Sequence, residues 1–309
     1  MKNKAITIVT GFFKINRKEW NNFNRTDDEY FEHFKVWGKI KNQLIVYVET
    51  EELKNKILAY RKSFNLEEQT IVHLVPDCIA LHPELYLSIK NATENKTQQL
   101  YRFLKKNPET WNATYNYIML LKAWCVTDAI KRGSASGMVA WVDFGYNHGG
   151  HPIDKDSDFN YTWEYDFPEK INLFLIQELD NRPLFDIILS MDTYIMGGVM
   201  VGVDSLWEQF WNLLVESSLE LNRCGLSDDD QNIILLSYRK SPEIFHTHMS
   251  NWSVQLKQFG GDHLKWAPTR KEGKFMATAK AFRRYIIKHI HCLKYAYGIY
   301  KHLLHQKIH

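Results

Sequence analysis

The sequence predicts an α/β protein with three layers, α/β/α, around a mainly parallel central sheet. Short β-branched and apolar runs alternate with segments whose apolar residues recur every three or four positions. Such alternation favours parallel strands covered by helices on both faces. The chain has 309 residues and is 45% hydrophobic, which is enough for a large buried core.

Strands and helices alternate through the first half. Residues 5–10 form a strand that ends at Gly11, and residues 27–39 are helical because Tyr30, Phe34 and Trp37 share one face. The other elements expected in this half are strands at 44–48, 70–75 and 138–143, helices at 51–60 and 112–131, and a weaker helical pattern at 97–106.

The helix at 112–131 carries one ambiguous residue. Its apolar face includes Tyr117, Leu121 and Trp124, and Lys122 lies off that stripe. A lysine at such a position is either solvated or turned toward a phosphate group.

The second half has a long loop at 144–170, whose aromatic residues either stack on a sugar or fix the loop to the body. Short apolar runs at 171–176 and 186–189 are expected to be strands. The run at 194–203 contains Gly197, Gly198 and Gly202, which indicate a bulge or the close approach of a ligand or backbone. A helix follows, with Ser205 and Glu208 as its capping box.

Acidic residues mark two places. Asp143 follows the apolar run MVAWV and precedes a Gly-rich turn, so it either caps the turn or lies where open α/β sheets bind ligands. Three acids at 228–230 precede a further helix, where Ser227 and Asp230 are candidates for capping. The functional alternative is a base or a metal ligand.

Cysteine usage and the distribution of charge indicate the cellular compartment and a partner for the C-terminal region. The four cysteines are far apart, which fits free thiols in the cytosol. Residues 273–309 contain eight Lys or Arg and no acid. The formal net charge is +3 for the whole chain, so residues 1–272 have a net charge of −5. In this tail an apolar stripe runs along one helical face and basic residues occupy the others. A basic amphipathic helix predicts binding to an anionic membrane surface, with packing on the body or RNA binding as alternatives.

Four motifs occur in order: TIVTGFFKINR, WVDFG, IMGGVMVG, and DDQ before a helix. With them the chain resembles the HtrL/YibB family, bacterial proteins linked to lipopolysaccharide biosynthesis, and more broadly glycosyltransferases of the GT-A type. The resemblance implies a GT-A-like catalytic domain over residues 1–272, followed by the basic amphipathic region at 273–309.

The resemblance also implies a donor site at the carboxyl ends of the first strands, for a nucleotide-sugar and first of all a UDP-sugar. WVDFG stands in the place of the D-x-D metal motif, although residues 140–142 supply no first acid. Mn²⁺ or Mg²⁺ would bind Asp143, with His248 or His263 completing its shell, and Asp229 or Asp230 would be the base. The residues implied for donor binding are Thr10, Gly11, Phe12, Arg17, Lys122, Asp143, Gly145, Gly197 and Gly198.

The implied activity is that of a hexosyltransferase in lipopolysaccharide biosynthesis, which adds a sugar to a lipid-linked lipopolysaccharide or O-antigen glycan. Such an enzyme is expected in the cytoplasm, peripheral on the inner face of the bacterial inner membrane, and no nucleic-acid partner is expected. One alternative is a non-catalytic envelope-assembly factor that retains the GT-A fold. Another is a nucleotidyltransferase. Such an enzyme normally has a Gly-rich, basic loop after the first strand, and GFFKINR contains too little glycine to indicate one.

Overall fold

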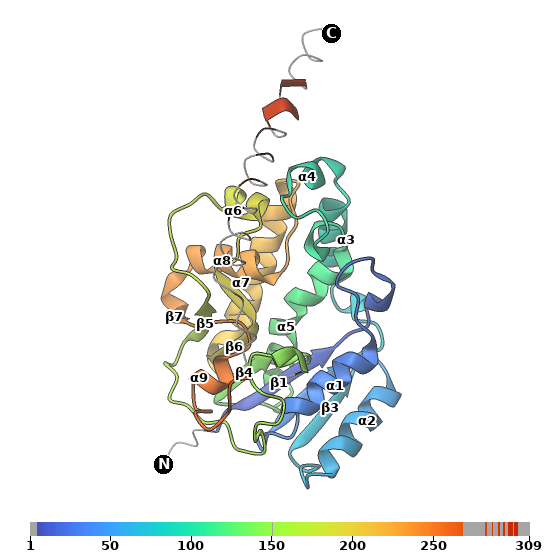
Figure 1. Cartoon of the computed structure of the whole chain (residues 1–309), viewed down its shortest axis with the longest axis vertical. Helices are drawn as coiled ribbons and strands as arrows, with labels where there is room; N and C mark the ends of the chain where they lie inside the picture. The colour runs from blue at the N-terminus through green and yellow to red at the C-terminus, as the bar shows by residue number, and fades with distance from the viewer. Residues whose placement is uncertain are drawn as a thin grey trace.

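The computed structural model describes residues 5–149 and 151–267, together with Phe282, Ile286, Ile290, Leu293, 296–298, Tyr300 and Lys301. In this part of the chain a seven-stranded sheet lies between layers of helices (Figure 1). The predicted α/β class with a mainly parallel central sheet is confirmed. The strands are β1 (Thr7–Phe12), β2 (Leu44–Val48), β3 (Thr70–Leu74), β4 (Met138–Val142), β5 (Ile171–Leu175), β6 (Ile195–Val203) and β7 (Phe245–Met249).

The α-helices of the described residues alternate with these strands or follow them. They are α1 (Asp27–Trp37), α2 (Glu51–Lys62), α3 (Pro83–Thr93), α4 (Lys96–Tyr101), α5 (Ala113–Lys131), α6 (Leu184–Ser190), α7 (Asp204–Arg223), α8 (Asp230–Lys240) and α9 (Gln255–Gln258). Short 3₁₀ turns lie between them, and one of these, η4 (Tyr146–Gly149), follows β4.

The sheet order is β3-β2-β1-β4-β6-β5-β7. Strands β1 to β4 are mutually parallel, whereas β6 runs antiparallel to both of its neighbours, β4 and β5. The carboxyl ends of β1 and β4 therefore lie at the same edge as the start of β6. Strands β2 and β4 read as uninterrupted apolar runs because both of their faces are covered.

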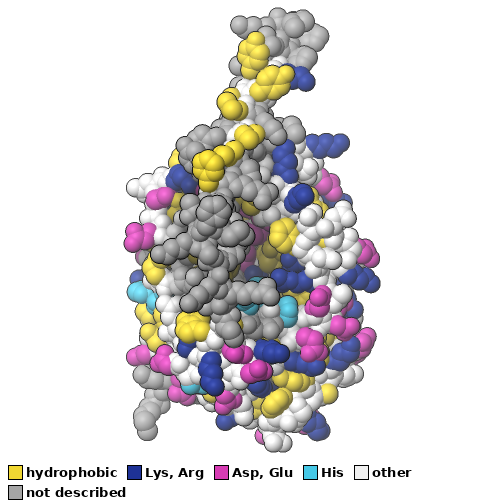
Figure 2. Space-filling model, viewed as in Figure 1, with side chains coloured by type: hydrophobic (Ala, Val, Ile, Leu, Met, Phe, Trp, Pro, Cys, Tyr) yellow, Lys and Arg dark blue, Asp and Glu magenta, His cyan; other side chains and the backbone are white. Residues whose placement is uncertain are grey.

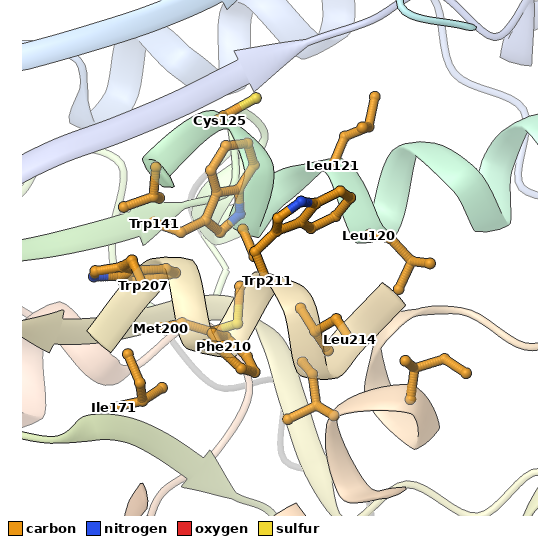
Figure 3. Close-up of a cluster of buried hydrophobic side chains, with 14 of the residues drawn as sticks. Leu120, Leu121, Cys125, Trp141, Ile171, Met200, Trp207, Phe210, Trp211 and Leu214 are labelled. Carbon is orange, nitrogen blue, oxygen red and sulfur yellow. The ribbon is translucent and has the colours of Figure 1, made fainter. Parts of the chain in front are cut away.

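Two hydrophobic cores lie on the two faces of the sheet. The larger one is formed with α3, α5, α7 and α8, and the other with α1, α2 and the segment after β4. In the larger core Trp141 of β4 and Met200 of β6 lie against Trp207 and Phe210 of α7, with Leu121 of α5 nearby (Figure 3). Helix α5 is thus enclosed by the sheet on one side and by other helices on the other.

Several local predictions need correction. Residues 186–189 lie in helix α6 and not in a strand, because a short apolar run fits either structure. Helix α7 begins at Asp204 without a side-chain cap. The predicted capping box at Ser205 is absent because the helix begins one residue before Ser205, which therefore lies within its first turn and is not the N-cap. The Asp204 carboxylate accepts the Gly137 N–H at 2.6 Å and ties the helix to the preceding loop. Strand β7 was not predicted, and helix α4 is shorter than the pattern at 97–106.

The long loop after β4 is confirmed, and its aromatic residues largely fix it to the body. Tyr146 and Trp163 are buried. The Trp163 indole donates to the Phe259 carbonyl at 2.6 Å, and the Tyr146 hydroxyl accepts the Leu256 N–H at 3.2 Å. These contacts hold α9 and the loop together beside the ends of β1 and β4.

Candidate active site

A pocket of about 270 Å³ opens where β1 and β4 end and β6 begins. Val142 of β4 pairs with Val199 of β6, and the Asp143 N–H donates to the Gly198 carbonyl at 2.8 Å. The candidate acid after β4 and the candidate glycines of β6 therefore meet at one edge of the sheet, the edge at which α/β proteins bind ligands. Helix α5 and the first turn of α8 also contribute to its lining.

A lysine lies between two carboxylates inside this pocket. Lys122 Nζ is 3.1 Å from Asp143 Oδ1, 2.8 Å from Asp230 Oδ2 and 3.2 Å from the Gly197 carbonyl oxygen. The side chains of Lys122 and Asp230 are only 6% and 4% exposed, whereas that of Asp143 is 40% exposed. The solvated alternative for Lys122 is therefore wrong. We call Lys122, Asp143 and Asp230 the lysine triad.

The charges of the lysine triad depend on one another. Burial lowers the pKa of Lys122, but the attraction of Asp143 and Asp230 outweighs burial and raises that pKa above its ordinary value. Burial raises the pKa of Asp230, and Lys122 acts against this shift. A buried carboxylate whose pKa is raised and which faces a pocket has the properties of a general base.

Asp143 is oriented by its neighbours. The Trp141 indole donates to Asp143 Oδ1 at 2.7 Å, and this is the oxygen that also contacts Lys122. The second oxygen, Oδ2, lies over Gly198 and would be 3.5 Å from a Cβ added there, an ordinary van der Waals distance. At Gly197 the close approach is made by the Asp230 carboxylate, because an added Cβ would lie within 2.5 Å of Asp230 Cγ. The close approach at Gly197 is thus made by an acidic side chain of the site, whereas the sequence had indicated a ligand, a backbone or a bulge.

Two arginines lie in the same pocket and converge on one aromatic ring. The guanidinium carbons of Arg17 and Arg25 lie 5.9 and 5.8 Å from the centroid of Tyr30, and Arg17 also donates to the Tyr30 hydroxyl. Gly145 packs against Tyr30, leaving 3.0 Å to an added Cβ. Within the described part of the chain neither arginine forms a salt bridge. We call Arg17 and Arg25 the arginine pair.

His148 lies next to the arginine pair as a neutral ring. Desolvation by the surrounding protein, and then the charge of Arg25, lower the pKa of His148 to about 4, although the residue as a whole is exposed. Arg25 Nη1 is 3.2 Å from His148 Nδ1. A guanidinium only donates, so Nδ1 accepts and the ring proton is on Nε2. Asn147 and His148 both have positive φ, 62° and 41°, and Asn147 stabilises this turn through two hydrogen bonds with Ile153.

Asp229, the other predicted base, does not line the pocket. It is the N-cap of α8, where its Oδ1 accepts the Gln231 N–H at 3.1 Å. Burial, and then the carboxylates of Asp230 and Glu109, raise the pKa of Asp229 well above its ordinary value. The cap proposed for Ser227 is therefore provided by Asp229, and only Asp230 of the two candidates reaches the lysine triad.

The predicted metal ligands are not brought together. His248 Nε2 is 2.9 Å from Asn172 Oδ1 and its ring stacks on Phe174, whereas His263 Nε2 is 3.0 Å from the Asp158 carbonyl. Neither histidine lines the pocket. Within residues 5–149 and 151–267, no three His, Cys, Asp or Glu side chains are placed to hold a metal ion. The structure thus leaves Asp143 without the predicted partners.

Of the remaining candidates for donor binding, all but one line the pocket. Gly11, Phe12 and Gly145 line the pocket, but Thr10 is fully buried and lies outside it. The sequence did not identify Arg25, Tyr30, His148, Gln231 and Trp252, which also line the pocket. Two of these had a usable signal, because His148 lies in the Gly-rich turn after Asp143 and Gln231 follows the acids at 228–230.

Comparison with known proteins gives three findings. A family model described as "Bacterial protein of unknown function (HtrL_YibB)" matches residues 4–260. Protein HtrL of Escherichia coli (strain K12) is 29% identical over 255 residues, which span 78% of this chain and 87% of that protein. The solved structure of "PaToxG Glycosyltransferase" overlaps with a TM-score of 0.33 and 13% sequence identity, covering 77% of this chain and 70% of that chain. A likeness this loose does not bear on function.

Proposed function

The chain belongs to the HtrL/YibB family of bacterial proteins, and from its pocket we propose that it is a glycosyltransferase that uses a nucleotide-sugar donor. One observation carries the proposal. A buried base candidate, Asp230, lies in the same pocket as two arginines that have no carboxylate partner among the described residues. Sugar transfer from a nucleoside diphosphate needs both features: a base for the acceptor hydroxyl and cations for the leaving diphosphate.

The reaction can be assigned to these groups. An acceptor hydroxyl oxygen attacks the anomeric carbon, and the bond between that carbon and the phosphate oxygen breaks. The electron pair of the broken bond goes to the diphosphate, which the arginine pair stabilises. The hydroxyl proton goes to Asp230. A direct attack of this kind would invert the anomeric centre. Trp252 lines the pocket and is 42% exposed, so it offers an aromatic face to an acceptor sugar.

Asp230→Asn is expected to lower transfer by about 10²–10⁴-fold, because the amide keeps the shape of the side chain but does not take the proton. The measurement is transfer, or hydrolysis of the donor, across UDP-, GDP- and CMP-sugars. Asp229→Asn is the matched control. It keeps the helix cap and removes a carboxylate outside the pocket, so it should retain most of the activity.

Absence of both turnover and nucleotide binding in the unmodified protein would exclude the proposed function. Nucleotide binding without turnover would favour the non-catalytic alternative, in which the fold serves envelope assembly. Equal losses in Asp229→Asn and Asp230→Asn would mean that Asp230 does not act as the base.

We further propose that the acceptor is a lipid-linked glycan at the cytoplasmic face of the inner membrane and that the C-terminal region binds this surface. In the described part of the chain no helix is long and apolar enough to span a bilayer. The described tail positions are helical, and their apolar side chains form an exposed row (Figure 2). Those exposed by 41–71% are Phe282, Ile286, Ile290, Leu293, Tyr297 and Tyr300. The basic residues predicted between them, except Lys301, lie outside the described residues.

Replacing both Ile286 and Leu293 with serine is expected to weaken binding to phosphatidylglycerol vesicles by at least ~10-fold, since each buried aliphatic side chain contributes about 1.5–3 kcal/mol. Co-sedimentation at low and high salt measures it. Leu87→Ser removes a leucine of α3 that is 55% exposed, between the 41% of Ile286 and the 71% of Leu293, and serves as the control. Binding that is unaffected by the double variant, or equal on neutral vesicles, would contradict this proposal.

A further inference from the structure

The lysine triad does not fit the divalent ion that a GT-A-type site implies. Asp143 is the one acid in the WVDFG motif at the end of β4, and its Oδ1 already accepts from the Trp141 indole and contacts the Lys122 ammonium. A divalent ion on this carboxylate would share it with a second cation, and the two would repel each other. Hard divalent ions also require several oxygen ligands, and the described residues offer no such group around Asp143.

An ammonium group lies between the two acids of the site. Lys122 Nζ contacts Asp143, Asp230 and the Gly197 carbonyl. One of these contacts is a hydrogen bond to a carbonyl and two are ion pairs, and the Lys122 side chain is only 6% exposed, so oxygens of the protein already occupy the space around the ammonium that a phosphate oxygen would need. Lys122 is therefore a positioning residue: it offsets the two carboxylates and fixes Asp230, and other groups have to contact the diphosphate.

The arginine pair has the properties of that diphosphate site. Two guanidinium groups that lie against the same ring without an acid between them repel each other, and a bound anion offsets this repulsion. Tyr30 and the Phe23 carbonyl, which accepts from Arg17 Nε at 2.8 Å, hold Arg17 in place before any ligand binds, and Arg25 lies against the same Tyr30 ring. His148 adds a neutral donor, Nε2–H, beside Arg25.

We infer that this protein binds the diphosphate of its donor through Arg17, Arg25 and His148 without a divalent ion, with Lys122 as the cation between Asp143 and Asp230. The inference rests on the proposed function for the identity of the donor. The part of the inference that does not depend on the donor is that these residues bind a diphosphate anion in the absence of a metal ion.

The test uses inorganic pyrophosphate as the probe and isothermal titration of the full chain in EDTA. Pyrophosphate should bind to the unmodified protein, and the double variant Arg17→Gln, Arg25→Gln should bind at least ~10-fold more weakly, since charge-assisted hydrogen bonds contribute about 1.5–3 kcal/mol each. Arg223→Gln removes an exposed arginine at the end of α7 and should bind like the unmodified chain. No binding in EDTA, or equal binding by the double variant, would overturn the inference.

A second test measures the thermal midpoint with and without Mn²⁺ in the unmodified protein and in Lys122→Met. If Lys122 had only a structural role, Mn²⁺ would have the same effect on both proteins. Instead, Mn²⁺ should leave the thermal midpoint of the unmodified protein unchanged and raise that of Lys122→Met, in which two carboxylates face each other without a cation. Stabilisation of the unmodified protein by Mn²⁺ would overturn the inference, even if the variant fails to fold. Transfer that requires Mn²⁺ would overturn it while supporting the proposed function. Pyrophosphate binding in EDTA without any transfer would support the anion site and reject the function.

Discussion

Lys122→Met is expected to lower the free energy of unfolding by about 3–5 kcal/mol, the usual cost of removing one partner from a buried ion pair. Methionine fills a similar volume, so the loss comes from the charge that remains. The Asp230 side chain is 4% exposed and would keep a carboxylate without its cation. Urea unfolding at several pH values measures the effect.

The loss should depend on pH in a defined direction. Without Lys122, burial holds the pKa of Asp230 in the folded protein above its unfolded value of about 3.9. A carboxyl group with a raised folded pKa favours the folded state below its unfolded pKa, and this contribution is lost as the pH rises through the folded pKa. Lys122→Met should therefore be closest to the unmodified protein near pH 4 and furthest from it near pH 8.

Two further variants isolate the cause. Lys131→Met removes a lysine from the same helix whose partner, Glu208, is 61% exposed, and exposed pairs contribute only about 0–1 kcal/mol. The double variant Lys122→Met, Asp230→Asn removes both charges and should recover most of the loss. If Lys122→Met were no less stable than Lys131→Met, the buried ion pair would have no role in stability.

The position of Lys122 shows why part of the site was not predictable. Off-stripe residues of a helix face solvent only when one side of the helix is open. Helix α5 has buried residues around its whole circumference, including Asn116, Tyr117, Ala123 and Val126, because α3 and α7 cover the side away from the sheet. That coverage depends on segments far apart in the sequence, so a single helical pattern does not reveal it.

Other parts of the site were predictable because they depend on local signals. Asp143 follows a buried strand and Asp230 begins a helix, and each of these boundaries leaves a pattern in the sequence. In contrast, strand β7 reads FHTHM, in which His246 and His248 interrupt the apolar run. Without that strand, His248 had no assigned surroundings and was available as a metal ligand. Its contacts with Asn172 and Phe174 exist only once β7 pairs with β5.

Gly197→Ala is expected to disrupt the site, whereas Gly198→Ala should not. Both glycines lie in β6, but an ideal Cβ on Gly197 would overlap the Asp230 carboxylate and lie within 2.5 Å of its Cγ. Asp230 has little room to move because α8 and Lys122 hold it. We expect the free energy of unfolding to fall by about 1–3 kcal/mol because of overpacking, and to fall further where Asp230 is moved away from Lys122. Transfer should be lowered by at least ~100-fold because the base is displaced.

Gly198→Ala is the matched control because its Cβ would lie 3.5 Å from Asp143 Oδ2, an ordinary van der Waals distance. Alanine is also better than glycine within a strand by about 0.5–1 kcal/mol, so this variant should be as stable as the unmodified protein or slightly more stable. Urea unfolding of the two variants side by side compares one added methyl group at adjacent residues. Equal stability of Gly197→Ala and Gly198→Ala would mean that Asp230 does not lie against Gly197, and the lysine triad would lose its geometric basis.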